Sequence, residues 1–317
     1  MKKTTLEDQD KQLHYNLGHR LWIYQKERFP LIAHGPLVLV FSFCAVAFSA
    51  RLRIDDWPTW QSMSVAFISS LIFFLQLRIA DEFKDADEDL RWRPYRAVPR
   101  GLVKLKELAV VFVVGAIIQL GLVLLWNMYL LPILIFAWLY LAAMSFEFGA
   151  RDWLKTRPIT YLWTHMLIMP IIDFYATASD WATSGALPPA GLLFFLITSF
   201  CNGIVIEIGR KIRTVDQEED GVETYSKLWG PGRASAIWWC FIAVTAFFAG
   251  CAAYEVGALI PVVFVLCTLM LAFGILTISF CRNLNHKLVT MFELSSALWT
   301  FFLYLSLGVL PGVFIHV

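Results

Sequence analysis

The sequence predicts an all-α integral membrane protein, a single bundle of nine transmembrane helices with cytoplasmic cap loops. Of its 317 residues, 58% are hydrophobic and 16% are charged, and the mean hydropathy is +0.63, which is too apolar for a soluble protein of this size. Apolar stretches recur from Leu31 to the C-terminus, and charged residues gather between them. The net charge of +1 is too small for a nucleic-acid surface. We therefore expect the lipid bilayer, and no nucleic acid, as a partner.

Nine stretches are long enough to cross a bilayer, since a transmembrane helix needs about 20 mostly apolar residues. They cover residues 31–50, 60–80, 108–126, 130–148, 160–178, 187–206, 235–254, 259–280 and 294–315. No stretch between them could form a separate domain, so residues 1–317 are predicted to be one membrane domain. It begins with a polar segment over residues 1–30 and carries acidic loops over residues 81–107 and 207–234.

The orientation follows from the basic residues, because lysine and arginine stay on the cytoplasmic side of a membrane. The N-terminal segment and every second connector hold 24 of the 26 lysines and arginines, and the other connectors hold only Arg51 and Arg53. The first 30 residues are too polar for a signal peptide. We expect a cytoplasmic N-terminus and, with nine spans, an external C-terminus. A bacterial inner membrane is the expected compartment.

The first acidic loop follows the second span and predicts a divalent cation. If that span continues as a helix, Asp81, Asp85 and Asp89 lie four residues apart on one face, with Glu82 beside the first of them. Like charges at this spacing repel one another, so a cation is needed to neutralise them.

The second acidic loop follows the sixth span and mixes both signs of charge. Asp216 and Asp220 are four residues apart, Glu219 lies next to Asp220, and Glu207 ends the span before them. The cations of this loop are Arg210, Lys211 and Arg213. Carboxylates beside cations favour a metal together with an anionic ligand such as diphosphate, and Mg²⁺ fits because it bridges one or two carboxylates to phosphates. Solvated connectors held by salt bridges are the alternative for both loops.

These residues resemble the UbiA superfamily of intramembrane prenyltransferases over about the whole chain. Asp81-Glu82-Phe83-Lys84-Asp85-Ala86-Asp87-Glu88-Asp89 is similar to the family's N-D-x-x-D-x-x-x-D motif, with Asp for Asn and Glu for Asp at its first two places. Arg93 to Gly101 resembles the R-P-x-x-x-G segment that follows. Asp216 to Asp220, followed by Gly221 and Thr224, is similar to the second acidic motif.

The resemblance implies a hydrophobic tunnel for a prenyl chain, with its diphosphate held at the cytoplasmic mouth by Mg²⁺. The metal ligands that it implies are Asp81, Glu82, Asp85, Asp89, Asp216, Glu219 and Asp220. The residues that it implies for substrate binding are Arg93, Lys155, Arg157, Glu207, Arg210, Lys211 and Arg213. Asp85, Asp89, Asp216 and Asp220 are the implied catalytic carboxylates, and aromatic rings would stabilise the carbocation.

Two acidic residues fall inside predicted spans, where inserting a charged side chain into the membrane costs about 2.5 to 3.5 kcal/mol of free energy. Asp173 is a candidate catalytic residue that accepts a proton from the acceptor substrate or from a cation, unless its span has already ended near the outer surface. Glu147 lies near the cytoplasmic end of its span and is predicted to pair with Arg151, four residues later.

Two functions within this fold remain open. The first is a transferase that moves the prenyl group of a prenyl diphosphate to a lipophilic, aromatic acceptor. The second is a terpene cyclase, in which the ionised chain attacks its own double bond and no acceptor is needed. A secondary transporter is disfavoured, because its charges would gather near the midplane and not at the ends of the helices.

Overall fold

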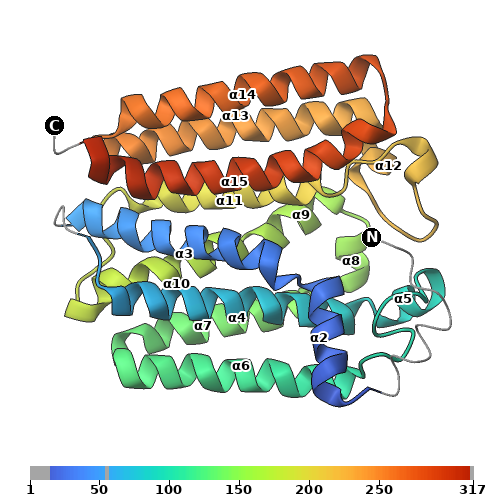
Figure 1. Cartoon of the computed structure of the whole chain (residues 1–317), viewed down its shortest axis with the longest axis horizontal. Coiled ribbons are helices and arrows are strands. Elements are labelled where there is room, and N and C mark those ends of the chain that lie inside the picture. Colours follow the sequence, from blue (N-terminus) through green and yellow to red (C-terminus); the bar gives the residue numbers. More distant parts are fainter. Residues whose placement is uncertain (1–14, 54–56, 315–317) are drawn as a thin grey trace.

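The computed structural model describes residues 15–53 and 57–314, and in these ranges every regular element is a helix (Figure 1). The α-helices are α2 (Leu17–Arg28), α3 (Leu31–Arg53), α4 (Trp60–Lys84), α5 (Ala86–Trp92), α6 (Leu105–Trp126), α7 (Leu131–Ser145), α8 (Arg151–Lys155), α9 (Pro158–Met166), α10 (Ile168–Trp181), α11 (Leu192–Gly209), α12 (Tyr225–Trp229), α13 (Pro231–Glu255), α14 (Leu259–Arg282) and α15 (His286–Phe314). The short 3-10 helices are η1 (Met128–Leu130), η2 (Glu147–Gly149), η3 (Ala182–Ser184) and η4 (Val215–Gln217).

Eight of the predicted spans correspond to helices that are long and apolar enough to cross a membrane. They are α3, α4, α6, α7 together with η1, α11, α13, α14 and α15. The fold class is therefore confirmed. The sixth span begins at Leu192, later than expected, because Pro188, Pro189 and Gly191 precede it, and Gly191 has a left-handed φ of 85°.

The remaining predicted span, residues 160–178, is divided into α9 and α10 by a break at Leu167. Pro170 lies in the first turn of α10 and has no N–H to donate to the carbonyl of Met166, so a continuous helix would lose a hydrogen bond there. Neither piece is long enough to count as a span by itself, and the number of nine spans stays a prediction.

The long helices run side by side and form two groups (Figure 1). Helices α4, α6, α7 and α10 lie on one side, and α11, α13, α14 and α15 lie on the other. Helix α3 joins the groups, since it packs against α4, α10 and α15. Large aromatic side chains fill the core between them, among them Phe73, Tyr175, Trp238, Trp299 and Tyr304.

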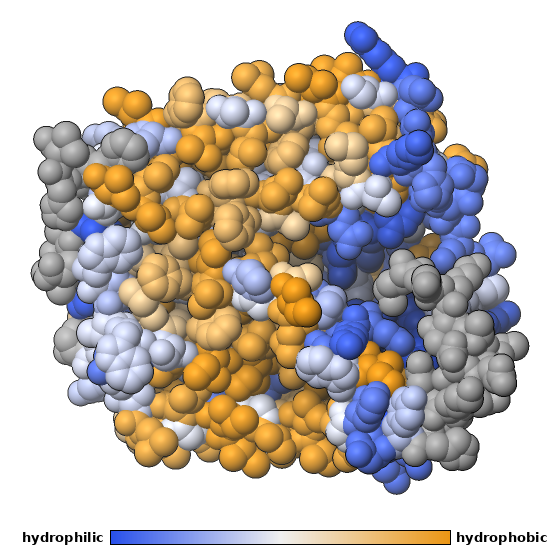
Figure 2. Space-filling model, viewed as in Figure 1, coloured by the Kyte–Doolittle hydropathy of each residue, from blue (hydrophilic) through white to orange (hydrophobic). Residues whose placement is uncertain are grey.

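The two ends of the bundle differ from its sides. Apolar side chains cover most of the visible flank, and hydrophilic ones gather at the end formed by α5, α8 and α12, which we call the charged end (Figure 2). Helix α2 crosses this end, and its Arg20 and Arg28 pair with Glu107 and Glu82 at 2.6 Å each. At the opposite end, Arg53 binds Asp180 at 2.9 Å.

Candidate active site

The first acidic segment lies where α4 passes into α5 at the charged end. Helix α4 ends at Lys84, and Asp85 forms the joint with φ −96° and ψ 9°. The backbone N–H of Asp85 still donates to the carbonyl of Asp81, and that of Asp89 donates to Asp85. The helical spacing of the three aspartates therefore continues through the joint, although the side chains find different partners.

Two of the acids in this segment are neutralised by arginines. Glu82 is 2% exposed and lies 2.6 Å from Arg28 and 2.9 Å from Arg78. Asp89 is 4% exposed and binds Arg96 at 2.6 Å and Arg93 at 3.3 Å. Both side chains therefore already have cationic partners.

Asp85, by contrast, forms no ion pair or side-chain hydrogen bond with the described residues. Burial raises the pKa of its carboxyl from 3.8 to about 6, Lys84 opposes this shift, and the negative charges of Asp81, Asp89 and Glu88 add to it. Asp81 is half-buried and lies 3.7 Å from Arg78 and 3.9 Å from Lys84. A partly buried carboxylate crowded by others, with no paired cation of its own, fits a divalent metal.

The described side chains do not by themselves form a metal site. Within residues 15–53 and 57–314, no three acidic, histidine or cysteine side chains converge closely enough to hold a metal ion. Mg²⁺ commonly takes one or two carboxylates and completes its shell with water and substrate phosphates, so this arrangement still fits it.

A compact polar cluster lies beside Asp85 and joins α4, η2 and α9. The Lys84 ammonium donates to the Tyr161 hydroxyl at 2.6 Å and lies 3.6 Å from Glu147. The other oxygen of Glu147 lies 3.6 Å from His165 Nε2, and the His165 ring stacks on Tyr161 with centroids 3.8 Å apart.

The predicted pairing of Glu147 with Arg151 is wrong. Helix α7 ends at Ser145 and α8 begins at Arg151, so the two residues do not share a helix, and Arg151 lies instead 3.7 Å from Glu88. Glu147 and Phe148 have φ of 52° and 54°, a conformation that turns the chain and directs the Glu147 carboxylate inward.

The end of α11 faces the same region. Glu207 is 5% exposed and pairs with Arg210 at 2.6 Å and Lys211 at 2.9 Å. Asp81 interacts electrostatically with Arg210, which places the ends of α4 and α11 near one another. The Lys211 ammonium lies 5.7 Å from the ring centroid of Tyr225 in α12.

The second acidic loop is irregular, with turns and the short η4 in place of an α-helix, so its four-residue spacings do not align carboxylates on one helix face. Asp216 and Asp220 are exposed, and hydrogen bonds from Thr214 and its own backbone lower the pKa of Asp216. Glu219 lies 3.5 Å from Arg93 of the first loop. The Trp92 ring packs so closely on Gly221 that an added Cβ would lie 2.4 Å from it. These contacts bring the two acidic loops together.

The predicted substrate-binding residues lie at different places. Arg93, Glu207, Arg210 and Lys211 lie where the loops meet, and Lys155 reaches this region through a 2.6 Å contact with Glu88. The other two do not converge on it in this conformation. Arg157 stacks on Trp153, and the Arg213 guanidinium donates to the carbonyl of Ile212.

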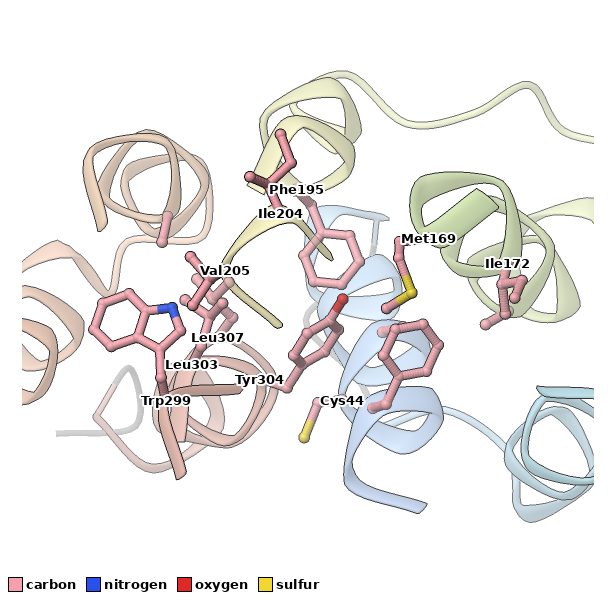
Figure 3. Close-up of a cluster of buried hydrophobic side chains, with 14 of the residues drawn as sticks. Cys44, Met169, Ile172, Phe195, Ile204, Val205, Trp299, Leu303, Tyr304 and Leu307 are labelled. Carbon is pink, nitrogen blue, oxygen red and sulfur yellow. The ribbon is translucent and has the colours of Figure 1, made fainter. Parts of the chain in front are cut away.

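Asp173 lies far from this cluster, within the core of the bundle. It is fully buried, and the Tyr304 hydroxyl donates to it at 2.5 Å. Figure 3 shows the Tyr304 hydroxyl pointing toward Phe195 and Met169, away from Trp299. The helix does not end before Asp173, as the alternative supposed, because α10 continues to Trp181.

The sequence reasoning did not assign Lys84, Tyr161, His165 and Tyr225 to the site. Lys84 is the one cation inside the first acidic motif, and this was a usable signal. The other three come from helices far along the chain, and only the packing of α4, α9, α11 and α12 brings them together.

Comparison with known proteins gives one family and one fold. Residues 38–306 match the model of the UbiA prenyltransferase family. No curated protein matches the sequence.

Three solved structures share the fold. A UbiA homologue from Aeropyrum pernix K1 superimposes with a TM-score of 0.65 and 13% identity, covering 89% of this chain and 98% of that one. A digeranylgeranylglyceryl phosphate synthase superimposes with a TM-score of 0.61 and 13% identity, covering 92% of this chain and 98% of that one. A UbiA homologue from Archaeoglobus fulgidus bound to DMAPP and Mg²⁺ superimposes with a TM-score of 0.54 and 14% identity, covering 90% of this chain and 99% of that one.

Proposed function

Because the chain belongs to the UbiA prenyltransferase family, we propose that it is a Mg²⁺-dependent intramembrane enzyme that ionises an allylic prenyl diphosphate and transfers the prenyl group to a lipophilic, aromatic acceptor. The observation that carries the proposal is the meeting of two acidic loops at the charged end of an apolar bundle, with Arg93 bridging them through Glu219. The related protein from Archaeoglobus fulgidus, which binds DMAPP and Mg²⁺, supports the choice of ligands.

Asp81 and Asp85 are the residues that would hold Mg²⁺ on the first loop, and Asp216, Glu219 and Asp220 are available on the second. Glu82 and Asp89 already have arginine partners, so we assign them to positioning α2 and α5 around the site. When bound, Mg²⁺ neutralises the charge that develops on the departing diphosphate.

The other residues of the charged end bind and orient the substrate. Arg210 and Lys211 lie at the start of the second loop, and Arg93 pairs across to that loop, so their cations can reach the remaining diphosphate oxygens. Glu207 holds the first two in place. The apolar helices below exclude water from the carbocation, whose charge aromatic rings would stabilise. We also propose that this end faces the cytoplasm, since it carries most of the basic residues.

The test is to incubate the purified protein with C5, C10, C15 and C20 allylic diphosphates, with and without Mg²⁺, and to measure binding and diphosphate release. We expect binding that requires Mg²⁺ and is lost with a chelator, and release that requires a lipophilic phenol. Asp85→Ala should abolish both. If no allylic diphosphate binds, the proposed function is wrong.

The buried pair of Asp173 and Tyr304 favours a second candidate, the membrane terpene cyclase. The Tyr304 hydroxyl that binds Asp173 belongs to a ring packed against Phe41 and Phe195, so a prenyl chain that extended this far into the core would bring a cyclic carbocation to a carboxylate that could remove its proton. The same incubations separate the candidates, because a cyclase would release diphosphate and form a cyclic hydrocarbon or alcohol without an acceptor.

A further inference from the structure

The Glu147–His165 pair has a hydrogen-bonding pattern that is incomplete in the protein alone. His165 Nδ1 lies 2.9 Å from the carbonyl of Tyr161, and because a carbonyl only accepts, Nδ1 carries the proton and donates it. In the neutral ring, Nε2 then presents a lone pair. It faces a Glu147 carboxylate oxygen at 3.6 Å, which is also an acceptor.

Both facing atoms are buried, and neither has a hydrogen-bond partner among the described residues. Glu147 is 4% exposed and His165 is 6% exposed, and the two unpartnered atoms are Glu147 Oε2 and His165 Nε2. Two buried acceptors that face one another without a donor are costly, since each has lost its water. One O–H group placed between them would donate its hydrogen to one of the two atoms or share it between both.

The backbone around Glu147 has an unusual conformation. Glu147, Phe148 and Gly149 are three successive residues with positive φ, and the first two are not glycine. Such residues cost about 1 to 3 kcal/mol each and gather at functional sites. The same segment borders a surface depression whose lining residues are Phe146, Gly149, Ala150, Arg151, Asp152 and Trp153, and Glu147 and His165 themselves do not line it.

From this geometry we propose that Glu147 and His165 form the subsite for the acceptor and that the acceptor carries an acidic O–H, as in a phenol. The inference rests on the proposed function. His165 Nε2 takes the hydroxyl proton, and the Glu147 carboxylate stabilises the resulting imidazolium. The electron pair left on the acceptor forms the new bond to C1 of the prenyl group. The C1–O bond breaks, and its electron pair leaves with the diphosphate.

Lys84 connects this subsite to the site of ionisation. Its ammonium lies 3.6 Å from Glu147, and its neighbour in the chain is Asp85, so acceptor and diphosphate would lie on opposite sides of one lysine. Its hydrogen bond to Tyr161 fixes the ring on which His165 stacks.

The test compares 1-naphthol with 1-methoxynaphthalene, which has similar size and no O–H, on the purified full-length protein. We expect 1-naphthol to bind at least about tenfold more tightly, the value of one good hydrogen bond to a charged group. His165→Asn keeps a donor to Tyr161 and removes Nε2, and it should lower prenyl transfer to 1-naphthol by about 10²- to 10⁴-fold.

Three measurements separate this role from a structural one. Mg²⁺-dependent binding of the allylic diphosphate should change by less than about threefold in His165→Asn, below 1 kcal/mol. Imidazole should restore transfer to His165→Gly. Ser145→Ala, whose hydroxyl donates only to Leu141 of its own helix, should behave as the wild type.

Equal binding of the two naphthalenes, or undiminished transfer by His165→Asn, would overturn the subsite. The same holds if the wild type binds an allylic diphosphate but neither binds nor alkylates 1-naphthol. Naphthol binding is measured without diphosphate, so a failure of the proposed function would show separately, as the absence of any diphosphate binding.

Discussion

At the scale of single residues, Asp85 differs from the other acids of its motif because the described residues provide no cation to pair with it. Removing its charge should affect metal binding first. We expect Asp85→Asn to weaken Mg²⁺-dependent binding of an allylic diphosphate at least about 100-fold, the effect of losing several kcal/mol of metal coordination. Isothermal titration calorimetry checks this.

Asp87→Asn is the matched control, because Asp87 is exposed in α5, two residues after Asp85. It should change Mg²⁺-dependent binding by less than about threefold, below 1 kcal/mol. Equal losses in both variants would mean that the overall negative charge of the loop matters, and not a particular ligand.

The raised pKa of Asp85 predicts a pH dependence in the metal-free protein. Its folded-state pKa of about 6 lies above the ordinary 3.8, so the folded state binds this proton more tightly than the unfolded state does. The stability that Asp85 contributes is therefore fully present below its ordinary pKa and is lost as pH rises through about 6.

Thermal unfolding of wild type and Asp85→Asn from pH 5 to pH 8, without Mg²⁺, measures this effect. Asparagine carries no charge at any pH. The melting temperature of the variant minus that of the wild type should therefore increase as the pH rises. A difference that does not change with pH would contradict the assignment.

At the scale of elements, Glu82 of α4 connects this helix to α2 through Arg28, and Arg78 of its own helix also pairs with it. Breaking a buried ion pair costs about 3 to 5 kcal/mol, so Glu82→Gln should lower the stability of the protein by this order. Mg²⁺-dependent diphosphate binding by the folded variant should change by less than about threefold. Thermal unfolding and calorimetry on the same sample check both.

Glu88→Gln is the comparison, because Glu88 pairs with Lys155 at an exposed place and such pairs are worth about 0 to 1 kcal/mol. If Glu82→Gln instead abolished metal binding and left stability unchanged, Glu82 would be a metal ligand, as its place in the motif implies.

The elements themselves were largely predictable, and the partners of the site residues were not. Hydropathy alone located α3, α4 and α6, because the bilayer requires an uninterrupted apolar segment of fixed length. The choice of Lys84 over Arg151 as partner of Glu147 depends on the turn that ends α7 and on the approach of α4. No pattern within either segment contains that information.

At the scale of the whole molecule, the acidic loops connect the two groups of helices, since the first follows α4 and the second follows α11. Gly221 is the closest point of contact, with φ of 71° and the Trp92 ring against it. Gly221→Ala should push the loops apart and weaken Mg²⁺-dependent diphosphate binding about tenfold or more, that is, by 1.4 kcal/mol or more.

Gly230→Ala separates this effect from backbone strain. Gly230 also has a positive φ, 85°, but no atom lies within 4 Å of its added Cβ. Both variants place a side chain at a positive φ and should lose about 1 kcal/mol of stability or more from the backbone, and Gly230→Ala should lose the more, since its ψ of 147° belongs to a region that essentially only glycine adopts. Only Gly221→Ala should lose diphosphate affinity, and equal losses would show that the loop contact is irrelevant to binding.

The charge alternation of the connectors predicted that both acidic loops would lie at one end of the bundle, and the structure places them there. The sequence could not show that Arg93 bridges to Glu219 or that Asp89 is occupied by Arg96. Those pairings depend on side chains more than 100 residues apart or on a helix joint that no periodicity reveals.

The break between α9 and α10 has a consequence for how the chain enters the membrane during synthesis. Helices of 9 and 14 residues are each shorter than the roughly 20 that a bilayer needs, and the second contains the fully buried Asp173. Transfer into lipid alone therefore stabilises this segment little. Its stable placement comes from helices made before it, among them α3 and α4, and from parts made after it, namely α11 and Tyr304 of α15. The insertion of this middle segment is thus completed only after α15 has been made.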